Sequence, residues 1–410
     1  MAEVQPLRAL HYDFDTAGPL ADVISPPYDV IDAAQRERLL ARSPNNVVAI
    51  DLPAGDDPYA AAAQTLQRWI AGGVVVRDAD PALWALRQTY TGPDGRRLAR
   101  RGLLGRVKVQ EYGPGRIRPH ERTHPGPKEA RLRLTRATKA NLSPIFALHS
   151  GDAWAALAPE GEPWAAATDD ENTLCELWRV TNPERIAAAQ GVLAPSELLI
   201  ADGHHRYETA RVYAEEAGEP EAGYVLMCLV SLDDPGLTVF PTHRLVKVAA
   251  DRRQALRDTL EELFELEPIE PADLRPPDGE GPLQLGYIDS FHEQAFRLTL
   301  RDQATAAAAL AAFPDAYQRL DTAILEALIL KGPLGLHEDD IAHLNGLGYS
   351  RTDAEALELV SAGRFDAAFF MRSTPIDQVR AIAAAGVNMP PKSTFFYPKV
   401  PTGLLFNPLQ

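Results

Sequence analysis

The sequence predicts a two-lobed α+β protein, and three observations support this class. With 410 residues, the chain is long for a single hydrophobic core. Short apolar runs typical of strands alternate with helical patterns through its first part. Near residue 248 this pattern starts again, which indicates a domain boundary. We therefore expect an N-terminal lobe over 1–247 and a smaller α/β lobe over 248–410.

The N-terminal lobe is predicted to begin with a segment rich in turn formers, followed by a helix and a hairpin. The two prolines of SPPYDVI restrict the backbone of that first segment. A helix is predicted over 58–71, because Gly72 and Gly73 end its pattern. Two strands joined by the turn formers at 92–95 predict a hairpin. We expect its arginine cluster on a solvated edge: Arg96, Arg97, Arg100 and Arg101.

Further strands are predicted at 143–149 and 174–180, followed by a short helix in NPERIAAAQGVL. The run at 223–232 is continuously apolar. Such a run is typical of a strand buried on both faces, so we expect it near the centre of the sheet.

A strand-to-helix turn in ADGHHR is the feature on which the rest of this lobe depends. An apolar run stops at Asp202 and Gly203, and a helical pattern begins at once, so His204, His205 and Arg206 lie at the turn. A helix N-terminus beside imidazoles and a guanidinium suits a phosphate, and Asp202 can orient an imidazole or hold a metal ion. The alternative is a polar turn whose histidines only bond locally.

The segment around residue 120 contains the zincin pattern H-E-x-x-H, formed by His120, Glu121 and His124. Zinc binding by this pattern needs both imidazoles on one face of a helix. Pro119 and Pro125 flank the pattern, and a residue before proline avoids helical angles. The sequence therefore favours a loop carboxylate over a zinc protease.

The helix that follows is expected to start after Pro127 and to carry Lys128 and Arg131. Glu121 would then lie on a loop that leads into a basic helix N-terminus. Its other interpretation is a surface carboxylate in a local ion pair.

The C-terminal lobe is expected to begin with a helix at 251–264 and a hairpin, and its tail has the order helix, strand, helix. Thr374 before Pro375 predicts the N-cap of the last helix. After that helix, PPKST presents Lys392, Ser393 and Thr394 behind a rigid Pro-Pro. This triplet is either a phosphate-binding segment or ordinary surface.

The composition narrows the possible partners and the compartment. Lys plus Arg total 41 against 57 Asp plus Glu, a formal net charge of −16, which argues against broad contact with a nucleic-acid backbone. Two cysteines, Cys175 and Cys228, fit a reduced compartment and offer no disulfide framework. No apolar targeting region or membrane-length run occurs, so we expect a cytoplasmic protein without a membrane partner.

Three motifs occur in the order PHE (119–121), ADGHHR (201–206) and PPKST (390–394). Together they resemble the archaeal free serine kinases, ADP-dependent enzymes whose N-terminal lobe is related to ParB and sulfiredoxin. From end to end the chain is also similar to a family of larger bacterial proteins catalogued only as a domain of unknown function. The hallmarks here are SPPYDVI, SPNNV, PHERT, DGHHRYETA and MPPKSTFFYPKVPTGL. The resemblance implies a ParB/sulfiredoxin-like mixed sheet in the N-terminal lobe and a site in the cleft between the lobes.

The kinase resemblance also implies roles for single residues. The glutamate of the Pro-His-Glu motif is the catalytic base in the kinases, and it corresponds to Glu121, with His120 beside it. The kinase triplet reads Lys-Thr-Thr followed by arginine, whereas Phe395 follows the triplet here, which leaves the phosphoryl donor open. The implied phosphate site consists of Asp202, His204, His205 and Arg206, which Lys392, Ser393 and Thr394 reach from the second lobe. We also expect Lys128 and Arg131, on the predicted basic helix, to bind the donor.

The expected activity is phosphorylation of free L-serine to O-phospho-L-serine, with ADP, ATP or pyrophosphate as donor. Such a transfer needs a carboxylate to take the hydroxyl proton and cations around the migrating phosphoryl group. We expect Mg²⁺ as a cofactor, held in part by Asp202.

No Walker A sequence occurs, so the chain is not a P-loop kinase. The alternatives are a ParB-like nucleotide-dependent DNA-binding module and a metal-dependent phosphohydrolase. Oligomeric state and reaction direction stay open.

Overall fold

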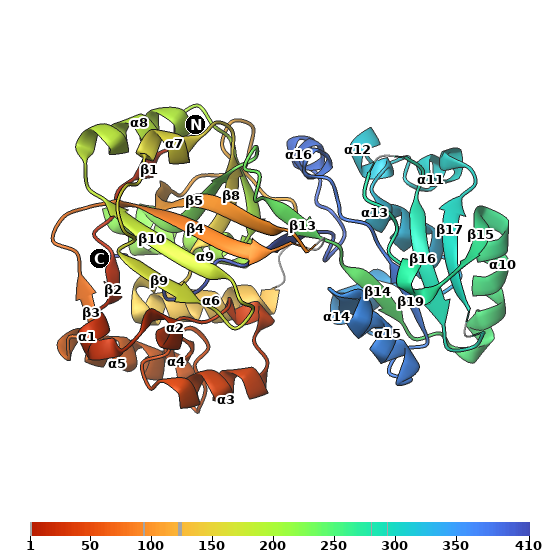
Figure 1. Ribbon diagram of the computed structural model, residues 1–410, viewed down its shortest axis with the longest axis horizontal. Helices are drawn as coiled ribbons and strands as arrows, with labels where there is room; N and C mark the ends of the chain where they lie inside the picture. The colour runs from red at the N-terminus through yellow and green to blue at the C-terminus, as the bar shows by residue number, and fades with distance from the viewer. Residues whose placement is uncertain (1, 93–94, 122–124, 280, 293) are drawn as a thin grey trace. The chain divides into compact units, whose positions relative to one another are not determined.

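Two β-sheets organise the chain in the computed structural model, which describes residues 2–92, 95–121, 125–279, 281–292 and 294–410 (Figure 1). The chain forms two units, each with its own sheet. Unit 1 comprises Met1–Pro119, Thr123–Thr238 and Pro398–Gln410, and unit 2 comprises His120–Arg122 and Val239–Tyr397.

These ranges differ from the predicted division after residue 247. The chain leaves unit 1 at Thr238, and its last residues return there because β21 (Asn407–Pro408) pairs with β7 (Ala140–Asn141). A prediction from local pattern divides a chain into consecutive ranges, so it misses such a return.

The sheet of unit 1 is mixed, as predicted. β11 pairs with β6 in parallel and β12 pairs with β8 in parallel, whereas the other described neighbours are antiparallel. The strand order is β6 (Ile117–Arg118), β11 (Leu198–Asp202), β8 (Ile145–His149), β12 (Tyr224–Ser231), β5 (Arg97–Lys108), β4 (Leu83–Thr91), β10 (Leu174–Val180) and β9 (Ala165–Thr168), and β1 (Val4–Gln5) also pairs with β5. The predicted hairpin is therefore β4–β5, and the apolar run at 223–232 is the central strand β12.

Helices cover this sheet and bury its apolar residues. Leu103 of β5, Met227 of β12, Leu193 of α8 and Tyr207 of α9 share one core cluster, and each is at most 1% exposed. Figure 1 shows α7 and α8 at one side of the sheet and the helices of the first 70 residues at the other. The helices of unit 1 are α1 (Phe14–Ala17), α2 (Leu20–Val23), η1 (Tyr28–Val30), α3 (Ala33–Arg42), α4 (Val48–Asp51), α5 (Pro58–Ala71), α6 (Pro125–Thr138), α7 (Ala153–Leu157), α8 (Pro183–Leu193), α9 (His204–Ala217) and η2 (Pro220–Gly223), and β2 (Leu10–Tyr12) pairs with β3 (Val75–Arg77) beside them.

Two predicted helix boundaries in unit 1 can be compared directly. α5 ends at Ala71 with Gly72 as its C-cap, as predicted. α6 begins at Pro125, earlier than the predicted start after Pro127. The first helical positions need no backbone N–H donor, so prolines are tolerated there, and the prediction placed the start too late.

The sheet of unit 2 is antiparallel between all its described neighbours, which corrects the predicted α/β lobe. The strand order is β15 (Phe264–Ile269), β17 (Ala295–Leu300), β16 (Gln284–Asp289), β19 (Ala367–Phe370), β14 (His243–Val246) and β18 (Leu347–Ser350). β18 and β19 are joined by α15 (Asp353–Ser361), as the tail pattern indicates. However, β14 lies between them, so this crossover is split and no parallel pair forms.

The remaining elements of unit 2 surround this sheet. β13 (Thr238–Phe240) pairs with β20 (Phe395–Tyr397). The helices are η3 (Ala250–Arg252), α10 (Arg253–Leu263), η4 (Pro271–Asp273), α11 (Gln303–Ala309), α12 (Asp315–Gln318), α13 (Asp321–Leu325), η5 (Glu326–Leu330), α14 (Glu338–His343) and α16 (Ile376–Ala384). None of the helices in the described part of the chain is long and apolar enough to cross a lipid bilayer.

Candidate functional site

The DGHHR motif forms the predicted strand-to-helix turn of unit 1. β11 ends at Asp202, and α9 begins at His204 directly after Gly203. Gly203 has a φ of +96°, in the left-handed region that favours glycine, and a Cβ there would approach the Arg206 guanidinium to 3.0 Å. The N-cap residue of this 14-residue helix is Gly203, which has no side chain to cap the first turn. The positive end of the helix dipole at this turn therefore suits an anion.

Asp202 is bound by two cations. Its Oδ2 accepts a hydrogen bond from Arg206 Nη2 at 3.0 Å, and its Oδ1 accepts one from Lys399 Nζ at 3.1 Å. Burial by itself would raise the pKa of Asp202, but Lys399 and Arg206, with a smaller effect from His204, hold this pKa well below its usual range. The carboxylate is ionised at neutral pH, and the three charged groups together carry one net positive charge.

Lys399 is a site residue that we did not predict. It lies 197 positions after Asp202, within the conspicuous segment MPPKSTFFYPKVPTGL, five residues beyond the predicted triplet. The side chains of Lys399 and Asp202 are only 14% and 17% exposed. The second lysine of that segment was the available signal, but nothing local distinguishes it from a surface lysine.

The expected Mg²⁺ site at Asp202 does not fit this arrangement. Each carboxylate oxygen is bonded to a cationic side chain, so a metal ion there would have to displace one of them. Within the described ranges, His, Cys, Asp and Glu side chains form no group of three that could hold a metal ion. The assignment of Asp202 as a metal ligand is therefore corrected to that of an ion-pair partner.

Arg100 lies next to this cluster, on β5. It is 1% exposed, and its Nη2 donates to Gln88 Oε1 at 2.5 Å. Gln88 Nε2 in turn donates to the backbone carbonyl of Lys399 at 2.9 Å. The guanidinium also lies 4.4 Å from the ring centroid of Phe146, which is the strand partner of Asp202. Gln88 therefore joins a third cation, the buried Arg100, to the segment that carries Lys399.

The predicted solvated edge is wrong for Arg100, whereas the side chain of Arg101 is 35% exposed. β5 has β4 on one side and β12 on the other, so Arg100 extends from a central strand into the interior. Arg101 donates to Asp234 Oδ2 at 2.9 Å. A hairpin pattern shows that two strands pair, but it does not show whether a third strand covers the outer edge.

Arg131, which we expected to bind the donor, forms a buried ion pair in the structure. Its Nη1 donates to Asp51 Oδ1 at 3.0 Å, and its guanidinium lies 4.1 Å from the ring centroid of Tyr28. Arg131 is 8% exposed and Asp51 is 3% exposed. The sequence pattern placed Arg131 correctly on a helix, but α4 and the SPPYDVI segment cover that face of α6.

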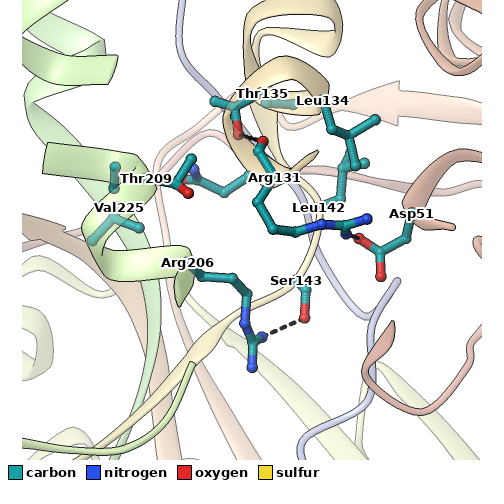
Figure 2. Close-up of a pocket in the computed structure, with 12 residues that line it drawn as sticks. Asp51, Arg131, Leu134, Thr135, Leu142, Ser143, Arg206, Thr209 and Val225 are labelled. Atoms are coloured by element: carbon teal, nitrogen blue, oxygen red, sulfur yellow. Dashed lines mark hydrogen bonds and ion pairs between the residues drawn. The ribbon is translucent and has the colours of Figure 1, made fainter. Parts of the chain in front are cut away.

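A small cavity separates this ion pair from the DGHHR turn. Figure 2 shows Arg131 pointing to Asp51, and Arg206 pointing from α9 to Ser143, which accepts a hydrogen bond from Arg206 Nη1 at 2.5 Å. The cavity has a volume of about 40 Å³. This volume is enough for water, since a buried water molecule needs about 10–15 Å³ of such space. It is too small for serine or a nucleotide.

The other predicted residues of unit 1 lie near the turn with different exposure. His204 is 6% exposed in the first turn of α9, and His205 is partly exposed beside it. Lys128 is partly exposed on α6, and its backbone carbonyl accepts a hydrogen bond from Thr209 of α9 at 3.4 Å. The structure therefore brings α6 against α9, but it assigns no ligand contact to Lys128.

His120 and Glu121 of the PHE motif belong to unit 2 and lie outside any helix. Glu121 forms a parallel bridge with Met389, whose N–H donates to the carbonyl of His120 at 2.8 Å. The His120 ring is buried, with Nε2 2.9 Å from Thr394 Oγ1. His124 lies outside the described residues. Because His120 is in an extended segment, the helical geometry that the zincin pattern requires is not formed.

Glu121 itself is partly exposed. Burial raises the pKa of Tyr349, and the negative charge of Glu121 adds to this effect. The carboxylate of Glu121 therefore lies within electrostatic reach of the Tyr349 ring, on which Arg244 also stacks at 5.2 Å.

The PPKST segment forms a turn that exposes one cation. Lys392 is exposed and has a φ of +56°, a left-handed conformation that is rare for a residue with a side chain. Arg244, which is 3% exposed, donates from Nη2 to the carbonyl of Pro391 at 3.1 Å. This buried hydrogen bond holds the backbone beside Lys392, and such conformations persist where the surroundings enforce them.

The hydroxyl groups of Ser393 and Thr374 have structural roles. Ser393 Oγ donates to the carbonyl of Pro390 at 2.7 Å and lies 2.7 Å from Thr322 Oγ1. Thr374 Oγ1 donates to the Ser393 carbonyl at 2.8 Å, whereas the N-cap position of α16 is Pro375. Both hydroxyl groups therefore fix the PPKST turn, and Thr374 is not the helix cap that we predicted. The phosphate contact of Ser393 stays a prediction.

Ser393→Ala is expected to lower the free energy of unfolding by about 1–3 kcal/mol, because it leaves a buried carbonyl and a buried hydroxyl without a partner. Urea denaturation measures this change. Ser361→Ala is the matched control: that hydroxyl is exposed at the end of α15, and we expect a change within about 0.5 kcal/mol. Unchanged stability together with weaker binding of phosphates would support Ser393 as a phosphate ligand.

Comparison with known proteins places the chain among relatives of undefined activity. The family described as "Protein of unknown function (DUF1015)" matches residues 4–323. A free serine kinase variant in complex with AMP is 14% identical over 68% of this chain and 84% of that chain, with a TM-score of 0.35, and a variant in complex with ADP gives the same values. SbnI with C-terminal truncation from Staphylococcus aureus is 11% identical over 72% and 84%, with a TM-score of 0.36. No curated protein matches the chain. Likenesses this distant carry no argument about activity.

Proposed function

The chain belongs to the family described as "Protein of unknown function (DUF1015)", and we propose that it transfers a phosphoryl group to the hydroxyl group of free L-serine. One observation carries the proposal: the ion-paired cluster of Asp202, Arg206 and Lys399 at the uncapped start of α9. The DGHHR motif supplies Asp202 and Arg206, and the PHE motif supplies the proposed base, Glu121; both motifs resemble those of free serine kinases, whereas Lys399 lies beyond the PPKST motif.

The cluster has the properties that a phosphate group requires. Two cations around one carboxylate leave a net positive charge, and the helix N-terminus adds backbone N–H groups. Asp202 holds the ends of both long side chains, so little of their conformational freedom remains to be lost on binding. In this proposal Arg206 and Lys399 bind the donor phosphates, while Arg131 and Asp51 support α6 beside them.

Glu121 is the proposed general base. The serine hydroxyl oxygen attacks the terminal phosphorus of ADP, ATP or pyrophosphate, and the new P–O bond forms as the bond to the leaving phosphate oxygen breaks. Glu121 takes the hydroxyl proton, and the leaving group departs with the electron pair of the broken bond. Lys392, exposed on its constrained turn, is the cation of unit 2 that we assign to the transferring phosphoryl group.

The direct test is a product assay. Purified protein is incubated with L-serine and, in separate tubes, with ADP, ATP or pyrophosphate, each with and without Mg²⁺, and O-phospho-L-serine is measured by mass spectrometry. Product in any tube is the expected result and identifies the donor. Absence of product in every tube, from protein shown to be folded by circular dichroism, would contradict the proposal.

Two further readouts test the alternatives in the same preparation. Phosphate release that needs a metal ion but no serine would support a phosphohydrolase. A DNA gel shift that strengthens steeply at low salt would support a DNA-binding module.

A further inference from the structure

A pocket of about 320 Å³ lies in unit 1, apart from the residues to which a role has been assigned. Five segments form its walls: the connection between β1 and β2, the stretch from the end of β3 to Pro81, β5, η2 and β21. Of the described residues that line it, none belongs to the PHE, DGHHR or PPKST motif. Its volume lies at the lower end of the range of typical small-molecule sites, which is 300–1,000 Å³.

The lining of this pocket is positively charged. Arg8, Arg77 and Arg106 contribute three positive charges, and Glu221 contributes one negative charge, so the lining carries a net charge of +2. The whole chain, in contrast, has a formal net charge of −16. A positive pocket in so acidic a protein attracts anions locally, although the chain as a whole repels them.

The charges of these arginines are not neutralised by the protein. Arg8 and Arg77 are exposed, and within the described ranges neither side chain forms an ion pair or a hydrogen bond. Arg106 donates from Nη2 to Gln5 Oε1 at 3.0 Å, and its guanidinium lies 4.9 Å from the ring centroid of Tyr224. An amide oxygen and an aromatic ring orient a guanidinium but leave its charge uncompensated.

Two carboxylates next to the lining are already paired with other cations. Asp78 follows Arg77 in the chain, and its Oδ1 lies 2.9 Å from Arg179 Nε. Glu3 Oε2 lies 3.0 Å from Lys108 Nζ. Neither carboxylate is therefore available to the arginines of the pocket.

Hydrogen bonds between the wall segments hold the pocket together without a ligand. Leu7 and Ala82 exchange both of their backbone hydrogen bonds, at 2.9 and 3.0 Å. Leu10 pairs with Arg77 and also with Phe406, directly before β21, and the C-terminus accordingly lies beside β2 in Figure 1. Because these segments are already fixed, a ligand does not have to order the backbone when it binds.

The charge and the donor groups of the lining match a phosphate monoester. A guanidinium binds phosphate oxygens through two parallel hydrogen bonds. A phosphate monoester carries about −1.5 to −2 charges at pH 7, which is close to the opposite of the net charge of the lining. Three prolines also line the pocket and offer apolar contacts to a short carbon chain: Pro6, Pro81 and Pro408.

We propose that this pocket binds the phosphate monoester of a small molecule, with Arg8, Arg77 and Arg106 around the phosphate group. The site shares no residue with the cluster of Asp202, Arg206 and Lys399. It does not depend on the proposed kinase function, and its binding is measured without catalysis.

Calorimetric titration of the full-length protein with glycerol 3-phosphate tests the proposal. Glycerol and succinate are the comparison ligands, for the carbon chain and for a pair of carboxylate charges. Glycerol 3-phosphate is expected to bind at least about tenfold more tightly than succinate, and glycerol should not bind. Absence of glycerol 3-phosphate binding, or equal binding of succinate, would overturn the proposal.

The double variant Arg8→Gln, Arg77→Gln locates the bound phosphate. It should weaken this binding at least about tenfold, because charge-assisted hydrogen bonds from two side chains are lost. Its unfolding midpoint should be unchanged, since both side chains are exposed. Arg38→Gln is the matched control, exposed on α3 and outside the lining, and should bind as the wild type does. An unchanged titration of the double variant would place the phosphate elsewhere and refute the site.

Glu221→Gln should change the affinity in the opposite direction. It removes a negative charge from the lining, so glycerol 3-phosphate should bind several-fold more tightly. A loss of stability alone would not produce such a gain. Glu215→Gln, at an exposed position of α9 outside the lining, should keep the affinity of the wild type. Unchanged or weaker binding by Glu221→Gln would also overturn the proposal.

Discussion

Glu121→Gln is expected to leave the fold intact and to lower serine phosphorylation by about 10²–10⁴-fold, the usual contribution of a general base. The amide has nearly the shape of the carboxylate but accepts no proton at neutral pH. The backbone bridge from Glu121 to Met389 does not involve the side chain, so the strand segment should be retained. Initial rates at saturating serine and donor measure the effect.

The matched control is Glu358→Gln, the same chemical change at an exposed position of α15. Its rate should equal that of the wild type. Donor affinity, measured by calorimetry, should be unchanged in Glu121→Gln, because a base contributes to the chemical step and not to donor binding. Near-normal turnover of Glu121→Gln would remove Glu121 as the base, and an equal loss in both variants would point to a general effect of charge.

Lys399→Met is expected to weaken phosphate binding at least about tenfold and to lower the free energy of unfolding by about 1.5–3 kcal/mol, the range for a hydrogen bond to a charged group. Methionine keeps most of the volume of lysine but has no charge. Of the two cations that bind Asp202, only Arg206 would then remain. Calorimetric titration with pyrophosphate and urea denaturation measure the two effects.

The same variant should change how stability depends on pH. The folded-state pKa of Asp202 is depressed, so the ion pairs contribute stability above the ordinary aspartate pKa near 4, and this contribution is lost as the pH falls through the folded-state value. Lys399→Met removes one of the two main charges that depress this pKa. Its acid-unfolding midpoint should therefore lie at a higher pH than that of the wild type.

Lys108→Met is the control for charge removal in unit 1. Lys108 binds Glu3 at 3.0 Å, but both side chains are exposed by 43–50%. Exposed pairs of this kind contribute about 0–1 kcal/mol, so stability and pyrophosphate binding should hardly change. A Lys399→Met protein that behaves like Lys108→Met would show that Lys399 is an ordinary surface cation.

Several elements of the site follow from local sequence. The strand at β11, the glycine turn and the start of α9 were predicted from a short apolar run, Gly203 and a helical pattern, all within about twenty residues. The hairpin β4–β5 and the end of α5 at Gly72 were predicted in the same way. In each case the residues that determine the backbone are neighbours in the chain, and their conformational preferences act locally.

The partners of the charged groups were decided by tertiary structure alone. Asp202 meets Lys399 from 197 positions away, and Arg131 is bound to Asp51 from 80 positions away. Arg100 is buried, and its guanidinium lies over the ring of Phe146 from β8, 46 positions further along the chain. The order of the strands in the sheet and the return of the last residues to unit 1 bring these groups together. The spacing of apolar residues along the chain predicts neither the strand order nor this return.

By itself, then, the sequence determined which motifs carry chemistry and where the chain turns, because glycine, proline and apolar spacing act on the local backbone. It placed Asp202, Arg206 and Glu121 among the functional candidates. Only the tertiary structure decided that Lys399 belongs with Asp202, that Arg131 pairs with Asp51, and that the Ser393 hydroxyl bonds to the Pro390 carbonyl. The physical reason is that a side chain's charge state and availability depend on its neighbours in space, and those are set by the packing of distant segments.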